Sequence, residues 1–293
     1  MIHYQEPVFR PPSEADSLIL QATYGCTHNR CAFCSMYQGK RFRVRPEEEL
    51  FSEIDWAGRH LPGVTRVFLA DGDAFALSPR RLIRILERLY QRLPTLERVT
   101  AYASPQNFRA RKLEDLRAVR AAGLRMLYLG LESGDDEVLR RIQKGATCER
   151  IVEVCRRAQE AGFDLSITVI LGLAGPAGSA RHAEKTAAAL DRIQPRYASA
   201  LTLMRTPRQP SFEEVVGDPA WRDLTPEEAL AECRALVAAM QADGVEFRSN
   251  HASNYLALKG RLQRDKPTLL ALIDRVLADP RSPLRRPEFL RAL

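Results

Sequence analysis

The chain has 293 residues, of which 45% are hydrophobic and 28% charged, a composition typical of a soluble globular protein. No apolar run approaches the roughly 20 residues that a membrane-spanning helix needs. The first residues are polar and resemble no secretion segment, so we expect a cytoplasmic protein without a membrane partner. The net charge of +7 allows nucleic acid as a partner but does not favour it, because basic and acidic residues are interspersed and no recognition motif accompanies them.

Apolar, β-rich runs alternate with amphipathic helical segments from residue 18 to residue 203. The predicted strands are Leu18–Ala22, Thr65–Leu69, Val99–Ala103, Met126–Leu131, Ser166–Leu171 and Ala198–Leu203. The predicted helices are Pro46–Leu61, Pro79–Leu93, Lys112–Ala122, Ile151–Ala161 and Arg181–Ile193. Six such units predict an α/β fold with a parallel sheet, either a partial (β/α)6 TIM-type barrel, which we favour, or a doubly wound open sheet.

The alternation weakens after residue 203. The Pro-rich stretch Arg205–Asp223 is predicted to be irregular, and Thr225–Ala242 to be a helix with Thr225 as N-cap and Glu228 at N3. A short strand at Val245–Arg248 and a terminal helix at Thr268–Leu277 are predicted to follow. We therefore expect an N-terminal segment at 1–17, a core at 18–203, and a C-terminal extension at 204–293 that packs on the barrel.

Three of the six cysteines fall within nine residues, directly after the first predicted strand, as Cys26-x4-Cys31-x2-Cys34. Thiolates are soft ligands that suit an Fe–S cluster or zinc, and their concentration indicates metal ligation in a reducing compartment. Three cysteines leave one iron of a [4Fe–4S] cluster open, whereas a structural zinc site closes four positions. Zinc with His28 as fourth ligand is the alternative at this point. The other cysteines have no close spacing and are predicted to be core residues: Cys148, Cys155 and Cys233.

This loop resembles the radical S-adenosylmethionine (SAM) superfamily, whose signature is three cysteines after the first barrel strand, usually with three residues in the first gap; here there are four. The resemblance covers residues 18–203 and is loosely closest to the oxygen-independent coproporphyrinogen oxidase and Elongator-like group. It implies a [4Fe–4S] cluster on Cys26, Cys31 and Cys34, with SAM bound at the open iron. It further implies reductive cleavage of SAM to a 5′-deoxyadenosyl radical that abstracts hydrogen from an unidentified substrate, and an external one-electron reductant of the flavodoxin or ferredoxin type.

Three other predicted strand ends are similar to SAM-binding segments of the same family. The Gly-Asp pair after the second strand looks like the motif that holds the SAM ammonium, and the Gly-Leu-Glu-Ser-Gly run at 130–134 like the segment that contacts the ribose and methionyl parts. A lysine ten residues after that run suits the SAM carboxylate, and the fifth strand ends like the adenine-binding element. The implied SAM-binding residues are Gly72, Asp73, Glu132, Ser133, Lys144, Gly172 and Leu173.

No residue is assigned a catalytic role from the sequence. Polar residues at strand ends and in the loop 247–255 are candidates to contact a polar or anionic substrate. These candidates are Tyr24, His28, Tyr102, Gln106, Arg205, Arg248, Asn250, His251 and Asn254. Two other functions stay open: a radical SAM enzyme that transfers methyl or methylthio groups to RNA, and a non-catalytic Fe–S or zinc-binding protein, which requires a fourth protein ligand and no SAM site.

Overall fold

The computed structural model describes residues 1–205, 210–279 and 281–292 and has the predicted α/β class. Its main sheet has eight strands in the order β1 (Leu18–Gln21), β4 (Arg66–Ala70), β5 (Arg98–Ala103), β6 (Leu124–Glu132), β7 (Asp164–Leu171), β8 (Tyr197–Thr202), β9 (Glu246–Arg248) and β10 (Lys259–Arg261). Pairing is parallel from β1 to β6 and from β7 to β9, and β10 is antiparallel to β9. From β1 to β9, successive strands of this sheet are neighbours with at least one helix between them, as in a partial (β/α)6 barrel, so the predicted fold class is confirmed.

The chain folds into two compact units. The first consists of Met1–Asn29, Met36–Leu129 and Val154–Leu165. The second consists of Arg30–Ser35, Gly130–Glu153 and Ser166–Leu293. The expected division into segments 1–17, 18–203 and 204–293 stays a prediction.

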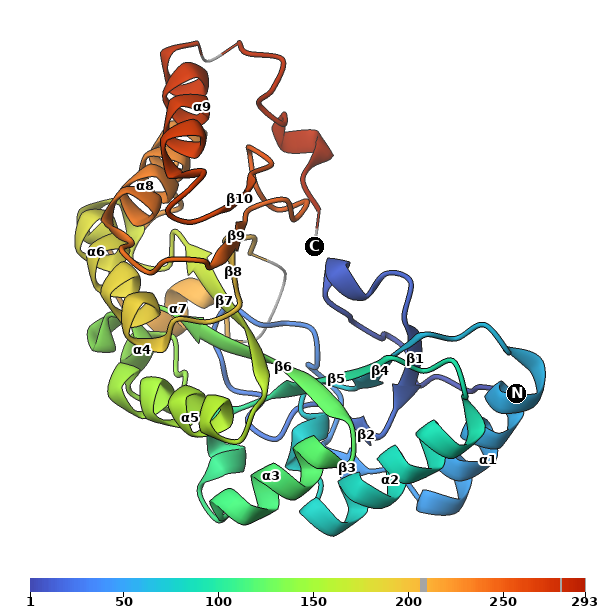
Figure 1. Cartoon of the computed structure of the whole chain (residues 1–293). Helices are drawn as coiled ribbons and strands as arrows, with labels where there is room; N and C mark the ends of the chain where they lie inside the picture. The colour runs from blue at the N-terminus through green and yellow to red at the C-terminus, as the bar shows by residue number, and fades with distance from the viewer. Residues whose placement is uncertain (206–209, 280, 293) are drawn as a thin grey trace. The chain divides into compact units, whose positions relative to one another are not determined.

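In the first unit, helices α1 (Glu47–His60), α2 (Pro79–Arg92) and α3 (Leu113–Ala121) follow β3 (Arg43–Val44), β4 and β5 along the chain and lie side by side (Figure 1). Helix α2 shows why the sequence folds in this way. Ser78 accepts a hydrogen bond from the Arg81 N–H at 3.4 Å, and Pro79 suits the first helical position. The α2 residues at helical spacing are completely buried: Leu82, Ile85, Leu86 and Leu89.

The strands of this unit place their carboxyl ends at one edge. Strand β4 is an unbroken buried run from Val67 to Ala70, as expected for a strand inside a parallel sheet. Its residues pair in register with β1, with Leu20 opposite Leu69 and Gln21 opposite Ala70. The loop after β1 and the turn after β4 therefore begin next to each other.

The second unit contains α4 (Asp136–Arg141), α6 (Gly175–Ile193), α7 (Phe212–Val216), α8 (Pro226–Ala239) and α9 (Lys266–Ala278); α5 (Cys148–Glu160) belongs to both units. Helix α8 packs between α6 and α9 (Figure 1). The predicted Thr225–Glu228 capping box is confirmed, with Thr225 N–H donating to Glu228 Oε2 at 2.8 Å.

The stretch Arg205–Asp223 differs in part from the irregular structure predicted for it. Helix α7 forms within it, because Ser211 and Glu214 make a capping box that the proline-rich composition obscured. The part of this prediction at 206–209 lies outside the described residues.

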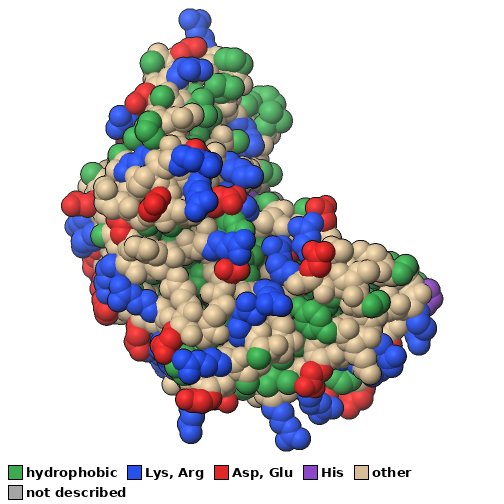
Figure 2. Space-filling view, in the orientation of Figure 1, with side chains coloured by type: hydrophobic (Ala, Val, Ile, Leu, Met, Phe, Trp, Pro, Cys, Tyr) green, Lys and Arg blue, Asp and Glu red, His purple; other side chains and the backbone are tan. Residues whose placement is uncertain are grey.

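No helix of the described residues is long and apolar enough to cross a membrane. On the face drawn in Figure 2, basic side chains are interspersed with acidic ones. Several surface arginines form ion pairs, such as Arg88 with Asp55 at 2.5 Å and Arg192 with Glu149 at 2.7 Å. Much of the positive charge is therefore balanced locally.

Candidate functional site

The loop that carries the three cysteines begins and ends on a short antiparallel pair of strands. β2 (Thr23–Tyr24) pairs with β3 (Arg43–Val44), which closes residues 25–42 into one loop. In the second unit, the Ala32 N–H donates to the Ile142 carbonyl at the end of α4, at 2.9 Å. The middle of the loop is thus fixed to α4 by its backbone.

Cys26 belongs to the first unit, and Cys31 and Cys34 to the second; all three are partly exposed. None of the six cysteines, all of which are described, forms a disulfide. Among the described residues, no group of three His, Cys, Asp or Glu side chains is arranged to hold a metal ion. The chemistry of the donor set, three accessible thiols in one loop, suits an Fe–S cluster.

The turn after β4 carries two buried aspartates on either side of Gly72. Oδ2 of Asp73 accepts hydrogen bonds from Thr27 Oγ1, from Ser104 Oγ at 3.1 Å and from Asn107 Nδ2 at 3.2 Å. Its Oδ1 is buried and has no hydrogen-bond partner among the described residues. Burial raises the pKa of Asp73, against the opposing effect of these hydrogen bonds. Asp73 therefore keeps one oxygen for a further donor.

Asp71, on the other side of Gly72, was not singled out from the sequence. It is completely buried, and its Oδ2 accepts hydrogen bonds from the Gly25 N–H at 3.1 Å and from Lys40 Nζ at 3.2 Å. Gly72 itself lies against the buried ring of Tyr37, where an added Cβ would be 2.3 Å from a ring carbon. The backbone can approach this ring only because residue 72 has no side chain.

At the end of β6, Glu132 forms a buried ion pair with Lys144, with 2.8 Å between Oε1 and Nζ. The two side chains are 8% and 10% exposed. Gly130 makes room for this pair, since a Cβ at that position would be 1.8 Å from Glu132 Oε1. Glu132 has a left-handed backbone (φ 62°), which is strained for a residue with a side chain. The sequence predicted both residues as SAM contacts, and the structure brings them together.

The residues after Glu132 have structural partners in the second unit. Ser133 is buried, and its hydroxyl accepts a hydrogen bond from the Asp135 N–H at 3.0 Å. The Gly134 N–H donates to Thr186 Oγ1 at 2.9 Å, and a Cβ at Gly134 would be 2.1 Å from the Lys185 carbonyl oxygen. The Glu-Ser-Gly run is thereby fixed against α6.

The turn after β7 is held by an acidic residue from α8. The N–H of Gly172, which has a left-handed φ of 92°, donates to Glu232 Oε1 at 2.8 Å. Glu232 is buried and also binds Ser179 and His182, both on α6. The carbonyl of Leu173 accepts a hydrogen bond from Trp221 Nε1 at 3.2 Å. This arrangement fixes the turn that the sequence likened to an adenine-binding element.

The candidate substrate residues of the first unit come from four different segments of the chain. Tyr24 lies under the Arg43 guanidinium, 5.0 Å from its ring centre, whereas the Tyr102 ring packs edge-on against Phe68 at 5.0 Å. His28 is partly exposed in the cysteine loop, and Gln106 lies in the 3-10 turn η3 (Pro105–Phe108).

In the second unit, four candidates lie in or next to the loop between β9 and β10, but two of them have structural partners. Arg248 pairs with Glu246 at 2.5 Å, and buried Asn254 binds Thr202 Oγ1 and the Ala200 carbonyl, both at 2.9 Å. The fifth candidate in this unit, Arg205, pairs with Glu213 and Asp223.

Asn250 and His251 are the candidates of this loop best placed to meet a ligand. Asn250 is exposed and His251 partly so. Nδ1 of His251 accepts a hydrogen bond from the Ser253 N–H at 3.1 Å. Burial, with a smaller contribution from Arg286, lowers the pKa of His251. Arg286 also donates to the His251 carbonyl at 3.0 Å and so fixes the backbone of the loop.

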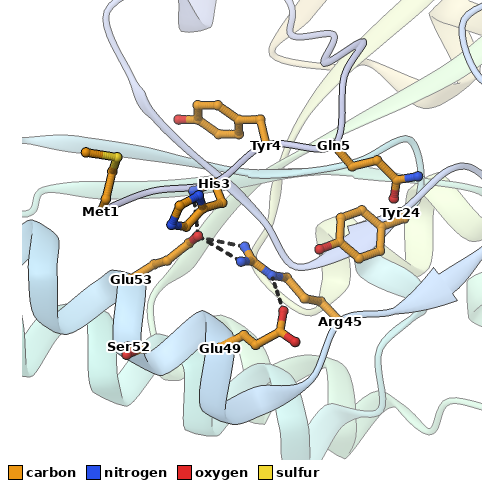
Figure 3. A pocket seen from close by; sticks show the side chains of 9 residues that line it. All are labelled: Met1, His3, Tyr4, Gln5, Tyr24, Arg45, Glu49, Ser52 and Glu53. Atoms are coloured by element: carbon orange, nitrogen blue, oxygen red, sulfur yellow. Dashed lines mark hydrogen bonds and ion pairs between the residues drawn. The ribbon is translucent and has the colours of Figure 1, made fainter.

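A cavity of about 510 Å³ lies in the first unit (Figure 3), and none of the predicted SAM-binding residues lines it. It is lined by the N-terminal segment, Tyr24, Arg45 and the first turns of α1. Arg45 forms a two-point ion pair with Glu53, at 2.7 and 2.8 Å, and the His3 N–H donates to the same carboxylate at 2.6 Å. The charged groups of this cavity thus bind one another.

Three residues that hold the candidate site were missed in the sequence: Asp71, Lys40 and Glu232. Glu232 was detectable, because it lies three residues after Ala229 and four before Leu236, on the buried stripe of a predicted helix. An acid on such a stripe requires a partner. Lys40 gave no signal, since nothing in its local sequence distinguishes it from an exposed loop lysine.

Comparison with known proteins decides the family. Residues 20–183, more than half of the chain, match the Radical SAM superfamily. The chain belongs to the radical SAM superfamily. Members of this superfamily use a [4Fe–4S] cluster and SAM and generally need an external reductant. The matched segment contains the three clustered cysteines and all the predicted SAM-binding residues.

Individual relatives of this radical SAM protein are distant. It is 26% identical over 172 residues to 4'-phospho-dehydrooxetanocin synthase of Priestia megaterium, covering 53% of this chain and 23% of that protein. It is 24% identical over 201 residues to the heme chaperone HemW of Bacillus subtilis (strain 168), covering 68% and 52%. The crystal structure of coproporphyrinogen III oxidase (HemN) from Escherichia coli shares the fold, with a TM-score of 0.55, 18% identity and coverage of 76% and 51%. The chain thus spans about half or less of these proteins.

Proposed function

We propose that the protein is a radical SAM enzyme whose cluster is held by Cys26, Cys31 and Cys34. When bound, the cluster and SAM supply the chemistry of the family, in which one electron cleaves SAM to methionine and a 5′-deoxyadenosyl radical. The observation that carries the proposal is the set of three thiols in a single loop after β1, inside the segment that matches the family. Three thiolates leave one iron for SAM, and this favours an enzyme over an electron carrier or a zinc protein.

The residues proposed to bind SAM are Gly72, Asp73, Glu132, Ser133, Lys144, Gly172 and Leu173. The buried Oδ1 of Asp73 supports a contact with the SAM ammonium, since it still lacks a donor among the described residues. Glu132 and Lys144 offer one charge of each sign, which suits a zwitterionic methionyl group. At Gly172 and Leu173 the backbone is held in position by Glu232 and Trp221, and backbone groups can approach a base closely there.

The substrate is proposed to be polar and to meet the loop between β9 and β10 through Asn250 and His251. Arg248 and Asn254 support this loop rather than face a ligand. We propose a flavodoxin or ferredoxin as the reductant and the cytoplasm as the location, because accessible cluster thiolates require a reducing compartment.

The test is anaerobic reconstitution with iron and sulfide, followed by incubation with SAM and dithionite and measurement of 5′-deoxyadenosine. We expect wild-type protein to bind one [4Fe–4S] cluster per chain and to release 5′-deoxyadenosine. Cys31→Ala should lose both properties. The matched control is Cys148→Ala: Cys148 was predicted to be a core residue but is partly exposed like the loop cysteines, and it lies at the start of α5, outside the loop. Tight binding of one zinc ion, with no cluster and no 5′-deoxyadenosine, would contradict the proposal.

A further inference from the structure

One carboxylate oxygen at the end of β4 binds both ends of the cysteine loop. Oδ2 of Asp71 accepts hydrogen bonds from the Gly25 N–H at 3.1 Å and from Lys40 Nζ at 3.2 Å. Gly25 directly precedes Cys26, and Lys40 follows Cys34 by six residues. We call Asp71 and Lys40 the loop clamp.

The loop clamp is buried and its ammonium group is saturated. The Asp71 side chain is 0% exposed and that of Lys40 is 6% exposed. Lys40 Nζ also donates to the carbonyls of Gln5 and Pro7, both at 2.5 Å. An ammonium has three protons, and these three acceptors use all of them. Because neither charge can be transferred to water at low cost, the pair fixes the two loop ends in one position.

Other contacts within the first unit bring the same two loop ends together. Asn29 Nδ2 donates to the Tyr37 carbonyl at 2.9 Å and to the Lys40 carbonyl at 3.4 Å. Gly25 has a left-handed φ of 70°, and a Cβ there would be 3.0 Å from the Lys40 carbonyl oxygen. The backbones at the two ends are thus in close contact where the loop clamp joins them.

We infer that Asp71 and Lys40 are positioning residues for the cluster-binding loop, an inference that rests on the proposed function. Neither residue supplies a ligand. By fixing both loop ends before iron binds, the loop clamp reduces the conformational freedom that the thiols lose on ligation. It therefore slows the opening of the loop through which iron is lost.

The experiment uses the full chain with both charges removed together, as Lys40→Met/Asp71→Leu, so that no buried charge is left unpaired. Iron release from reconstituted protein to a ferrous-iron chelator is followed under anaerobic conditions. The melting temperature and circular dichroism of the cluster-free protein report whether the fold is intact. Lys259→Met is the matched control, since Lys259 is 67% exposed.

We expect the double variant to keep the wild-type circular dichroism and to release iron at least tenfold faster, while Lys259→Met behaves as wild type. A folded double variant with the wild-type release rate would overturn the inference. If the double variant loses its circular dichroism, the milder Lys40→Gln is measured instead, and there too an unchanged release rate overturns it. Failure of the wild-type protein itself to take up a cluster would instead count against the proposed function.

Discussion

Two strand ends of this protein, one in each compact unit, place a buried acid against a lysine, and they differ in what surrounds the pair. After β4, Asp71 and Lys40 also bind the loop and the N-terminal segment, through Gly25, Gln5 and Pro7. After β6, Glu132 meets Lys144 from a strained left-handed backbone, in space left by Gly130. The first pair is built into the scaffold, whereas the second has the strain typical of functional sites. Similar ion pairs thus have a structural role at the end of β4 and, as we propose, a ligand-binding role at the end of β6.

The largest expected effect is on the free energy of unfolding, and it distinguishes the Asp71–Lys40 ion pair from the Glu132–Lys144 ion pair. Lys40→Met leaves Asp71 buried without its counter-charge, so we expect a loss of about 3–5 kcal/mol in the free energy of unfolding. Lys144→Met should cost about 1–3 kcal/mol, because Glu132 can then leave its strained backbone conformation and recover part of the cost. Urea denaturation of the cluster-free variants measures both values. Equal losses would show that the Glu132 pair is as much a part of the scaffold as the Asp71 pair.

A smaller effect is expected from Gly130→Ala, which acts on the second pair alone. The added Cβ would be 1.8 Å from Glu132 Oε1 and 2.9 Å from Lys144 Nζ, so the ends of both side chains must move from their present positions. We expect a loss of only about 1 kcal/mol in stability, at the low end for overpacked sites, because the atoms that the Cβ meets are ends of flexible side chains. Affinity for SAM, measured by equilibrium dialysis with reconstituted protein, should fall at least tenfold. Gly63→Ala is the control, since a Cβ at Gly63 meets nothing within 4 Å; unchanged SAM affinity in Gly130→Ala would remove Glu132 and Lys144 from the site.

Much of the fold could be predicted from the sequence, because buried parallel strands and amphipathic helices have strong periodic signals. The six core strands and the Thr225 cap are examples. Strand ends were also recognisable, since Glu132 follows an apolar run and glycines mark close approaches of the backbone.

What the sequence did not reveal are partners that are distant along the chain. Lys40 lies 31 residues from Asp71, and Glu232 lies 60 residues from Gly172. Contacts over such separations leave no local pattern in the sequence, because only the folded sheet brings these residues together. The same applies to the loop between β9 and β10. Asn254 is polar and was therefore a candidate ligand contact, but its side chain forms hydrogen bonds with β8.

The smallest effect concerns Asp73, the acid of the β4 turn that has no lysine partner in the described structure. Burial raises its pKa above the ordinary aspartate value of about 3.9. Between the ordinary and the raised pKa, the folded state binds more protons than the unfolded state, so stability falls as the pH rises through this window. Asp73→Asn removes this titration, and its stability relative to wild type should therefore increase with pH above 4, by at most about 1.4 kcal/mol per pH unit.

Denaturation of Asp73→Asn and wild type across pH 2–7 measures this slope, and Asp55→Asn gives the opposite sign as a control, mostly below about pH 4 because its pKa is lowered. Arg88 and Arg92 lower the pKa of Asp55, so its carboxylate stabilises the fold above the ordinary pKa and this contribution is lost as the pH falls. Asp55→Asn should thus lose stability relative to wild type as the pH rises. If Asp73→Asn shows the same sign as Asp55→Asn, Asp73 has a cationic partner in solution, and its Oδ1 is no longer available for the SAM ammonium. If the two variants show the expected opposite slopes, Asp73 Oδ1 is still an acceptor without a donor. The proposed contact with the SAM ammonium requires such an acceptor.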